Sequence, residues 1–364
     1  MPDALGFLYP EIDDDKCVDC GLCEQVCSFK TNYNIDLNLP KPLVYAARHK
    51  DLHEVETSQS GAAFIAFSDW ILNQGGVVYG AGYSDHFRVI HKRAVNPKER
   101  DEFKGSKYVQ SDMNVVFSQV NEDLKNGLVV LFSGTPCQTS GLSSFIGKKY
   151  HRNLYLIDII CHGVPSPFIW QNYLGYLKRE KRTSIISVNF RDKSKYGWHS
   201  HVESYKFADS SSSVYKCDYT RIFYSHISLR YSCGSCPFTN TCRPSDITIA
   251  DFWGVEKTNA SILATDNKGC SMIMLNTAKA KQCFEYVQSD LECMEVKLDD
   301  CLQPNMIHPS KLHSKRDSFE QDYKKWGFEK TMKKYGFIGW KNRAWKCEVY
   351  FKQKISVLIH LIKK

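Results

Sequence analysis

The sequence predicts a mixed α/β fold, because segments with helical periodicity and segments with strand periodicity alternate along most of its 364 residues. Apolar and charged residues make up 43% and 24% of the chain, both close to the averages of globular proteins. We therefore expect two or three modest domains with hydrophobic cores, and neither a disordered chain nor a fibrous repeat.

The N-terminal half predicts a small module followed by a sheet with helices. Residues 1–36 are short, acidic and rich in cysteine, and the prolines at 40 and 42 predict a linker, which places a boundary near residue 37. Beyond it, apolar periodicity separates helices from strands. The expected helices are residues 62–74, 111–125 and 167–181 and a segment that begins at 138, and the expected strands are residues 77–83, 88–95, 128–132 and 154–160.

The C-terminal half predicts a second region with antiparallel strands. Strand-like runs at 185–190, 201–207 and 214–219 surround a polar serine tip and predict an antiparallel meander. Further strands are expected at 246–251 and 271–275, and a helix at 278–288. We divide the chain into residues 1–36, a partial ferredoxin-like module; 37–183, a cofactor-binding α/β region; 184–335, a second cysteine-containing region; and 336–364, a basic tail.

The last 21 residues, 344–364, are basic and carry Ile355, Leu358, Ile359 and Ile362 at helical spacing. This pattern predicts a terminal helix that packs on the body of the protein, or one that lies on an anionic membrane surface. The start of the chain lacks the pattern of a secretory signal, and no run approaches 18 apolar residues. We expect a cytoplasmic protein, with peripheral contact to the inner membrane face as the alternative.

The net charge of +8 is spread along the chain, without a signature of nucleic-acid binding. It fits a solvated basic surface, or a docking face for acidic electron carriers or anionic ligands. We therefore expect no nucleic-acid partner.

The 15 cysteines indicate metal or redox chemistry, because a reducing cytosol disfavours disulfides. Cys17, Cys20, Cys23 and Cys27 form C-x2-C-x2-C-x3-C, which predicts a [4Fe-4S] cluster, with zinc as the alternative. Two-cluster ferredoxins carry this run twice, whereas it occurs once here and is followed by Ser28 instead of proline. The fourth ligand of an N-terminal cluster is therefore not identified.

A second group consists of Cys233, Cys236 and Cys242, spaced C-x2-C-x5-C. Cys161 is the candidate for a fourth ligand, because it ends an apolar strand and begins a turn. The spacing alone fits zinc and iron–sulfur equally well, and the N-terminal run favours iron–sulfur.

Two segments are placed to bind phosphate. The strand at 128–132 leads through Gly134 and Thr135 into a predicted helix, whose free amides would face a pyrophosphate. Ser58, Ser60 and Gly61 precede another predicted helix in the same way. Two such helix ends suit a dinucleotide cofactor, although ordinary helix capping explains either one.

Several segments together resemble the signature blocks of a known family. In order, they are residues 58–61, 105–108, 134–138, 161–163, 190–193, 197–198, 233–242 and 251–254. They resemble those of the coenzyme F(420) hydrogenase/dehydrogenase beta-subunit family, which includes plant 7-hydroxymethyl chlorophyll a reductase. The resemblance extends from about residue 15 to about residue 335.

The resemblance implies FAD in the central region, beside a [4Fe-4S] cluster held by Cys161, Cys233, Cys236 and Cys242. It also implies that an N-terminal ferredoxin-like module, half of which is missing here, carries electrons in or out. The residues implied for cofactor binding are Ser58, Ser60, Gly61, Gly105, Ser106, Lys107, Gly134, Thr135, Pro136, Cys137 and Gln138.

Some of these residues also have plain structural interpretations. Lys107 would pair with phosphate or be solvated, and Cys137 would be a reactive thiol near the flavin or a small buried residue. His162 and His199 are the candidate catalytic proton donors, with a structural role as the alternative.

The leading hypothesis is a flavin-dependent oxidoreductase in which FAD exchanges electron pairs and the clusters carry single electrons. Its redox partner would be a ferredoxin or a reduced deazaflavin or flavin carrier. Relatives encoded with bacterial surface-polysaccharide genes suggest a role in modifying a sugar. The alternatives are a non-catalytic electron-transfer or scaffold subunit and a zinc-stabilised binding protein.

Overall fold

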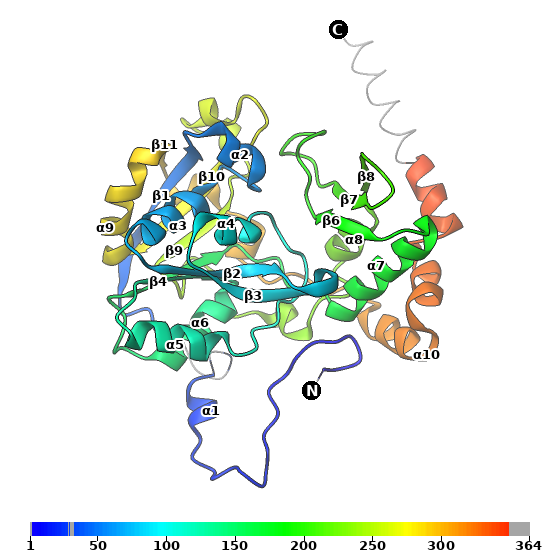
Figure 1. The fold of residues 1–364 in the computed structure, drawn as a ribbon, viewed down its shortest axis with the longest axis horizontal. Coiled ribbons are helices and arrows are strands. Elements are labelled where there is room, and N and C mark those ends of the chain that lie inside the picture. The colour runs from blue at the N-terminus through cyan, green and yellow to red at the C-terminus, as the bar shows by residue number, and fades with distance from the viewer. Residues whose placement is uncertain (1, 28, 30–32, 349–364) are drawn as a thin grey trace.

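The computed structural model describes residues 2–27, 29 and 33–348. The strands are β1 (Asn38–His49), β2 (Val77–Tyr83), β3 (Val89–Ala94), β4 (Val130–Gly134), β5 (Leu154–Ile159), β6 (Ile185–Asn189), β7 (Glu203–Phe207), β8 (Ser213–Lys216), β9 (Ile247–Asp251), β10 (Ser271–Thr277) and β11 (Leu291–Val296). Within the described residues they form an eight-stranded sheet of order β11-β1-β10-β9-β5-β4-β2-β3 and a three-stranded sheet of order β6-β7-β8 (Figure 1).

The helices of the same residues are α1 (Leu22–Gln25), α2 (Leu52–Thr57), α3 (Ala63–Asn73), α4 (Pro97–Arg100), α5 (Val116–Lys125), α6 (Pro136–Ile146), α7 (Pro167–Lys181), α8 (Asp218–Tyr224), α9 (Ala278–Val287) and α10 (Arg316–Lys334). Helices α3 and α9 pack on one face of the larger sheet, and α5 and α6 pack on the other. The sheet is mixed: β2, β4, β5 and β9 run parallel, while β1, β3, β10 and β11 join by antiparallel pairs. The predicted α/β class is therefore confirmed.

The strand pattern explains how helices cover both faces of the larger sheet. Along β4, Val130 and Phe132 face the layer of α5 and α6, while Leu131 faces the layer of α3 and α9. Side chains alternate between the faces of a strand, so a strand covered on both sides is apolar throughout. This is why residues 128–132 are apolar without alternation.

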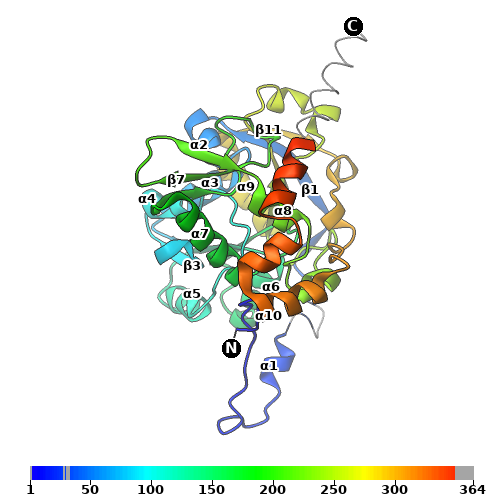
Figure 2. The ribbon, with the colours of Figure 1, turned by 90° about the vertical axis from the view of Figure 1, so that its right-hand side faces the viewer.

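A second core lies between the three-stranded sheet and helices α7, α8 and α10, which Figure 2 shows side by side. Trp170 and Tyr173 of α7 are buried at its centre. Leu5 and Phe7 are fully buried in the same core, so the first residues of the chain are anchored to the body. The segment that follows extends outward, turns, and leads back toward the body through α1, as both ribbon views show.

Most predicted elements occur, several with the predicted bounds. The strand at 77–83, the helix at 167–181 and the antiparallel meander are confirmed. The predicted helix at 111–125 begins only at Val116, because Asp112 forms a bridge with Ile90 of β3. The predicted strand at 214–219 ends at Lys216, two residues before α8 begins.

The predicted linker at the prolines is wrong, because β1 runs through it. The register of β1 against β10 is irregular between Asn38 and Leu43, and both prolines lie in that stretch. Proline lacks the amide that a regular ladder needs and is tolerated at such bulges. Strands β1 and β11 and helix α10 were not predicted at all.

The four-part division of the chain remains a prediction. Strands from both sides of the predicted boundary at residue 183 build the larger sheet. The apolar positions of the predicted tail helix lie outside the described residues. Among the residues that the structure describes, no helix is long and apolar enough to cross a membrane.

Candidate functional site

A cavity of about 410 Å³ lies at the carboxyl ends of the parallel strands. Ser133 and Gly134 end β4, Ile159 ends β5, and Ala250 and Asp251 end β9, and all five line the cavity. This is the edge of an α/β sheet where ligands commonly bind, and the volume is in the usual range for a ligand pocket.

Most residues predicted to bind the cofactor converge on this cavity from segments far apart in the sequence. Those that line it are Ser58, Ser60, Gly105, Ser106, Lys107, Gly134, Thr135 and Gln138. Gly61, Pro136 and Cys137 are not among the lining residues.

Two buried polar atoms in the cavity wall have no hydrogen-bond partner in the described part of the chain. They are Ser58 Oγ and His91 Nδ1. His91 is 5% exposed, and its other ring nitrogen lies 3.1 Å from the Ser133 carbonyl oxygen. Burial lowers the pKa of His91 to about 4, so the ring is neutral at pH 7. With Nε2 donating to Ser133, Nδ1 becomes an acceptor that a ligand must satisfy.

Lys107, which belongs to one of the predicted cofactor-binding blocks, supplies a cation to the cavity. Its Nζ donates to the carbonyl oxygens of Lys104 and Gly105, at 2.9 and 3.2 Å. An ammonium has three donors, so one remains for a ligand. Burial lowers the pKa of Lys107 to about 7, which makes its charge sensitive to a bound anion.

The two predicted phosphate-binding helix ends differ. At α6, Thr135 and Gln138 form a capping box, and the Thr135 amide donates to Gln138 Oε1 at 3.0 Å. At α3, the residue before the helix is Ala62, with a φ of 64° and no side-chain cap. The free amides at the start of α3 lie next to the cavity, which Ala63 and Phe64 line.

Gly61 serves packing, because a Cβ at this position would lie 2.3 Å from the Ala47 carbonyl oxygen. Its amide donates to Ser271 Oγ at 2.9 Å, and Ser60 Oγ donates to the Cys270 carbonyl oxygen at 2.6 Å. These bonds hold the residues before α3 against β10. Of Ser58 and Ser60, it is therefore Ser58 whose hydroxyl is left for a ligand.

Another part of the cavity wall is built around a buried ion pair. Arg191, which is 3% exposed, pairs with Asp251 and donates to the Trp198 carbonyl oxygen at 2.8 Å. Trp198 Nε1 donates to Asp251 Oδ1 at 2.6 Å. Trp253 lines the cavity and stacks on Trp198, with ring centroids 4.8 Å apart. The pair and the stacked rings give this wall a rigid aromatic surface.

The two histidines predicted as catalytic are separated. His162 lines the cavity, and burial lowers its pKa. His199 does not line it; its exposed ring has Nε2 3.3 Å from Glu256 Oε1. His201 lines the cavity instead, with Nδ1 2.7 Å from the Tyr224 hydroxyl. His91 and His201 belong to no sequence motif and were not predicted as site residues.

Two of the four predicted ligands of the second cluster, Cys161 and Cys233, lie near one edge of the cavity. Cys161 follows β5 and lines the cavity, and its Sγ accepts from the Gly163 amide at 3.4 Å. A Cβ on Gly163 would lie 3.2 Å from Cys233 Cβ, so glycine permits this close approach. Burial raises the pKa of Cys161, and the neighbouring thiols of Cys233 and Cys236 raise it further.

Cys242 lies apart from this group in its contacts. It is exposed, and its carbonyl oxygen accepts from the Tyr33 hydroxyl at 2.5 Å. Tyr33 and Phe29 pack on the ring of Phe238, with centroids 5.0 and 5.6 Å away. The N-terminal segment therefore contacts the cysteine-containing loop directly.

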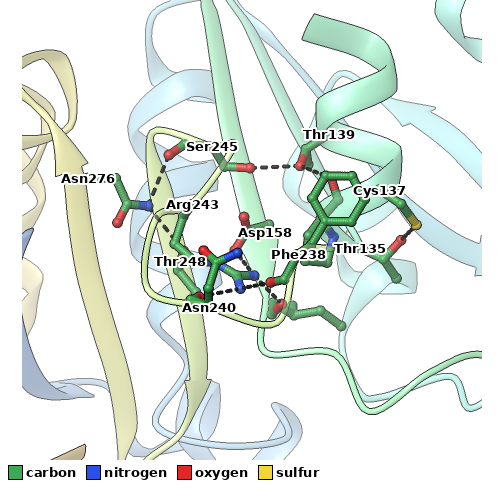
Figure 3. Close-up of polar contacts among 12 residues, drawn as sticks. Thr135, Cys137, Thr139, Asp158, Phe238, Asn240, Arg243, Ser245, Thr248 and Asn276 are labelled. Carbon is green, nitrogen blue, oxygen red and sulfur yellow. Dashed lines mark hydrogen bonds and ion pairs between the residues drawn. The ribbon is translucent and has the colours of Figure 1, made fainter. Parts of the chain in front are cut away.

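The same loop is held by Arg243, which Figure 3 shows between Asp158 and the loop. Arg243 Nη2 donates to Asp158 Oδ1 at 2.9 Å, and Nη1 donates to the Phe238 carbonyl oxygen at 2.8 Å. The guanidinium thus links the loop to the end of β5, next to Cys161.

The N-terminal cysteines flank α1, where Gly21 precedes the helix with a φ of 69°. Cys17, Cys20 and Cys23 are exposed, and Cys27 is half-buried. Among the residues that the structure describes, no group of three or more His, Cys, Asp or Glu side chains is arranged to hold a metal ion.

Comparison with known proteins gives two family matches. Residues 128–300 match the family described as the C terminus of the beta subunit of coenzyme F420 hydrogenase/dehydrogenase, and residues 10–30 match the 4Fe-4S binding domain. A chain in a solved structure of the F420-reducing [NiFe] hydrogenase complex from Methanosarcina barkeri is similar at 14% identity, with a TM-score of 0.47. The similarity covers 81% of this chain and 92% of that chain. No curated protein matches.

Proposed function

The chain belongs, through residues 128–300, to the coenzyme F420 hydrogenase/dehydrogenase beta-subunit family, and we propose that it is an iron–sulfur flavoprotein that passes electrons between FAD and [4Fe-4S] clusters. The family and the 4Fe-4S segment make it an electron-transfer oxidoreductase. The observation that carries the flavin proposal is that Cys161, a predicted cluster ligand, lines the same cavity as the unpartnered atoms Ser58 Oγ and His91 Nδ1.

The cavity fits a flavin dinucleotide in its chemistry. The uncapped amides of α3, the Ser58 hydroxyl and the Lys107 ammonium all suit a pyrophosphate. His91 Nδ1 is placed to accept a hydrogen bond from the ligand, and Trp253 offers a flat apolar wall. A bound flavin would supply the exchange between electron pairs and single electrons.

The chain's own residues would shield the cavity from water and handle protons at its surface. The stacked Trp198 and Trp253 and the buried Arg191–Asp251 pair would shield one side of the site from water. The neutral rings of His162 and His201, whose pKa burial lowers, are placed to accept a proton or to donate an N–H hydrogen bond at the cavity surface. We propose these two, in place of His162 and His199, as the proton-handling residues.

For the redox partner we propose a ferredoxin or a reduced deazaflavin or flavin carrier. The exposed Cys17, Cys20 and Cys23, which precede α1 or lie in it, suit contact with a one-electron protein carrier. A sugar substrate from surface-polysaccharide biosynthesis is our hypothesis for the electron-pair side, where Trp253 and Tyr224 provide aromatic and hydroxyl surface.

The test is anaerobic purification followed by quantification of flavin, iron, sulfide and zinc. We expect about one flavin per chain, with roughly four irons if one cluster assembles and roughly eight if both do. Cys236→Ser should bleach the iron–sulfur absorbance and leave most of the flavin bound. Cys293→Ser, which changes a half-buried cysteine on β11, is the matched control and should keep both. A colourless protein that holds only zinc and no flavin would contradict the proposal.

A further inference from the structure

We propose that the outer surface of α10 and of the residues that follow it, up to 346, binds an anionic lipid membrane. Helix α10 lies away from the larger sheet in Figure 1 and faces the viewer in Figure 2. We call this region the basic surface; its members are Lys324, Lys325, Trp326, Lys330, Lys333, Lys334, Trp340, Lys341 and Arg343. None of them lines the cavity, so the inference is independent of the proposed electron transfer.

The basic surface concentrates positive charge over a short stretch of chain. Residues 324–346 carry eight lysine or arginine side chains and a single acidic one, Glu329. All seven cationic members of the basic surface are exposed. Neighbouring Lys and Arg side chains attract the headgroups of anionic lipids, and their contributions add up at a membrane surface.

The fold brings these side chains together around aromatic rings. Gly327, with a φ of 70°, breaks α10 directly after Trp326, a conformation that glycine adopts without strain. Beyond the break, Lys330 and Lys334 extend over the ring of Trp326, with Nζ 5.7 and 4.8 Å from its centroid. The chain then turns, and Lys341 Nζ lies 3.4 Å from the Lys334 carbonyl oxygen. Charges on both sides of the turn therefore form one continuous surface.

Several of these cations are left for an external anion. Glu329 pairs with Arg179 of α7, with Oε1 2.8 Å from Nη2. The partners of Lys330 and Lys341 within the described part of the chain are tryptophan rings and a backbone carbonyl, not carboxylates. A cation held over an aromatic ring keeps its full charge, so both lysines can still attract lipid headgroups.

Trp340 adds an apolar anchor to the charge. Its side chain is 74% exposed, and Lys341 Nζ lies 5.9 Å from the centroid of its ring. Tryptophan is enriched at the interface between membrane and water, where its ring is partly apolar and partly polar. Segments that lie on membranes combine such apolar side chains with electrostatic attraction to anionic lipids.

A hollow of about 440 Å³ adjoins the basic surface and favours a lipid over an acidic protein as the partner. Its polar lining includes Lys315, Ser318 and Lys334, and its apolar lining is Ile227 and Phe337. Lys334 is paired with an aspartate at 2.6 Å, so Lys315 is the lysine of the hollow that can receive a headgroup. A basic opening with apolar walls suits a phosphate that carries an acyl chain, and basic pockets of this kind bind lipid headgroups.

The sequence beyond the described residues continues in the same chemical character. The described part ends at residue 348, and residues 349–364 contain four lysines and no acidic residue. Ile355, Leu358, Ile359 and Ile362 occur there at helical spacing. Basic sequences with this apolar spacing are typical of membrane surfaces, and this one begins where the basic surface ends.

The test is co-sedimentation of the full-length protein with vesicles of phosphatidylcholine, with and without phosphatidylglycerol. We expect binding only when the anionic lipid is present, and release at high salt, because salt screens the attraction. Removing three charges together, by Lys330→Gln, Lys341→Gln and Arg343→Gln, should weaken binding by at least about tenfold. Trp340→Ser should weaken it several-fold without removing charge.

The matched control is a triple variant with the same change in net charge at exposed positions elsewhere. Lys98→Gln, Lys125→Gln and Lys149→Gln change α4, α5 and the turn after α6, and should leave vesicle binding unchanged. Because all six changed side chains are exposed, the urea midpoint and the flavin and iron content should equal those of wild type in both triple variants. Failure of vesicle binding would thus be distinguishable from failure of the proposed function.

Three results would overturn the inference. One is wild-type protein that does not bind the anionic vesicles. Another is equal weakening by both triple variants, which would mean that net charge alone is responsible. The third is binding to immobilised polyglutamate that the first triple variant loses while no vesicle is bound, which would identify the basic surface as the site of an acidic protein partner.

Discussion

The buried pair of Arg243 and Asp158 offers a sharp test of how the cysteine-containing loop is held (Figure 3). Their side chains are 1% and 0% exposed, and Arg243 Nη2 lies 2.9 Å from Asp158 Oδ1. Arg243→Met leaves the carboxylate buried without its partner, which costs about 3–5 kcal/mol of unfolding free energy. Burial raises the pKa of Asp158 and the guanidinium lowers it, so the variant removes the group that keeps this carboxyl charged.

The assay is urea unfolding of the anaerobic protein, followed by far-UV circular dichroism. With a urea dependence of about 3 kcal/mol per molar, the midpoint should fall by about 1–1.7 M. The loss should be smaller at pH 5 than at pH 8, because the unpaired buried carboxyl has a raised pKa and is neutralised by a proton at the lower pH.

Two further variants test the reasoning. Asp158→Leu with Arg243→Met replaces both charges by apolar groups and should be more stable than Arg243→Met alone. Arg179→Met breaks an exposed pair with Glu329, whose atoms lie 2.8 Å apart, and should cost less than about 1 kcal/mol. An unchanged midpoint in Arg243→Met, or a double variant no more stable than the single one, would refute the argument.

Three other predictions follow from buried groups and ring contacts. The unfolded state binds a proton at His91 below about pH 6.5, and the folded state only below about 4. The unfolding free energy should therefore fall by about 3 kcal/mol as the pH is lowered from 6.5 to 4. His91→Gln should flatten this dependence in urea titrations at pH 4 to 7. Flavin affinity should weaken as pH rises through about 7, where Lys107 loses its charge, and Lys107→Met should weaken binding and remove that pH dependence in fluorescence titrations. Phe238→Ala removes ring contacts worth about 0.5–1.5 kcal/mol each with Phe29 and Tyr33, and should speed proteolysis of the N-terminal segment several-fold; an unchanged rate would mean that these rings do not hold it.

Local periodicity was enough to predict most of the central elements. The strand at 77–83 and the helix at 167–181 have strong local patterns, and their bounds were predicted correctly. Strand β1 was missed because two prolines interrupt it, and its pairing with β10 and β11 depends on residues more than 200 positions away. A local pattern cannot indicate a strand whose stability comes from such distant partners.

The site was predicted where residues occur in motifs and missed where they do not. Ser58, Lys107 and Thr135 belong to recognisable blocks, and the structure brings them to one cavity. His91 lies in a strand pattern in which a histidine facing inward is indistinguishable from any other buried residue. Its importance follows from an unpartnered ring nitrogen, a property of the folded chain alone.

The cysteines predicted to hold the second cluster show the same difference between spacing and folded geometry. Spacing along the chain groups Cys242 with Cys233 and Cys236, because the three lie within ten residues. In the fold, Arg243 holds the stretch after Cys236 against Asp158, the side chain of Cys242 is exposed, and Tyr33 bonds to the backbone of Cys242. Cys161 follows β5, far from the other cysteines in sequence, and the fold brings Gly163 beside it close to Cys233. The folded chain, and not the spacing, therefore shows which predicted ligands lie beside the cavity at the carboxyl edge of the sheet.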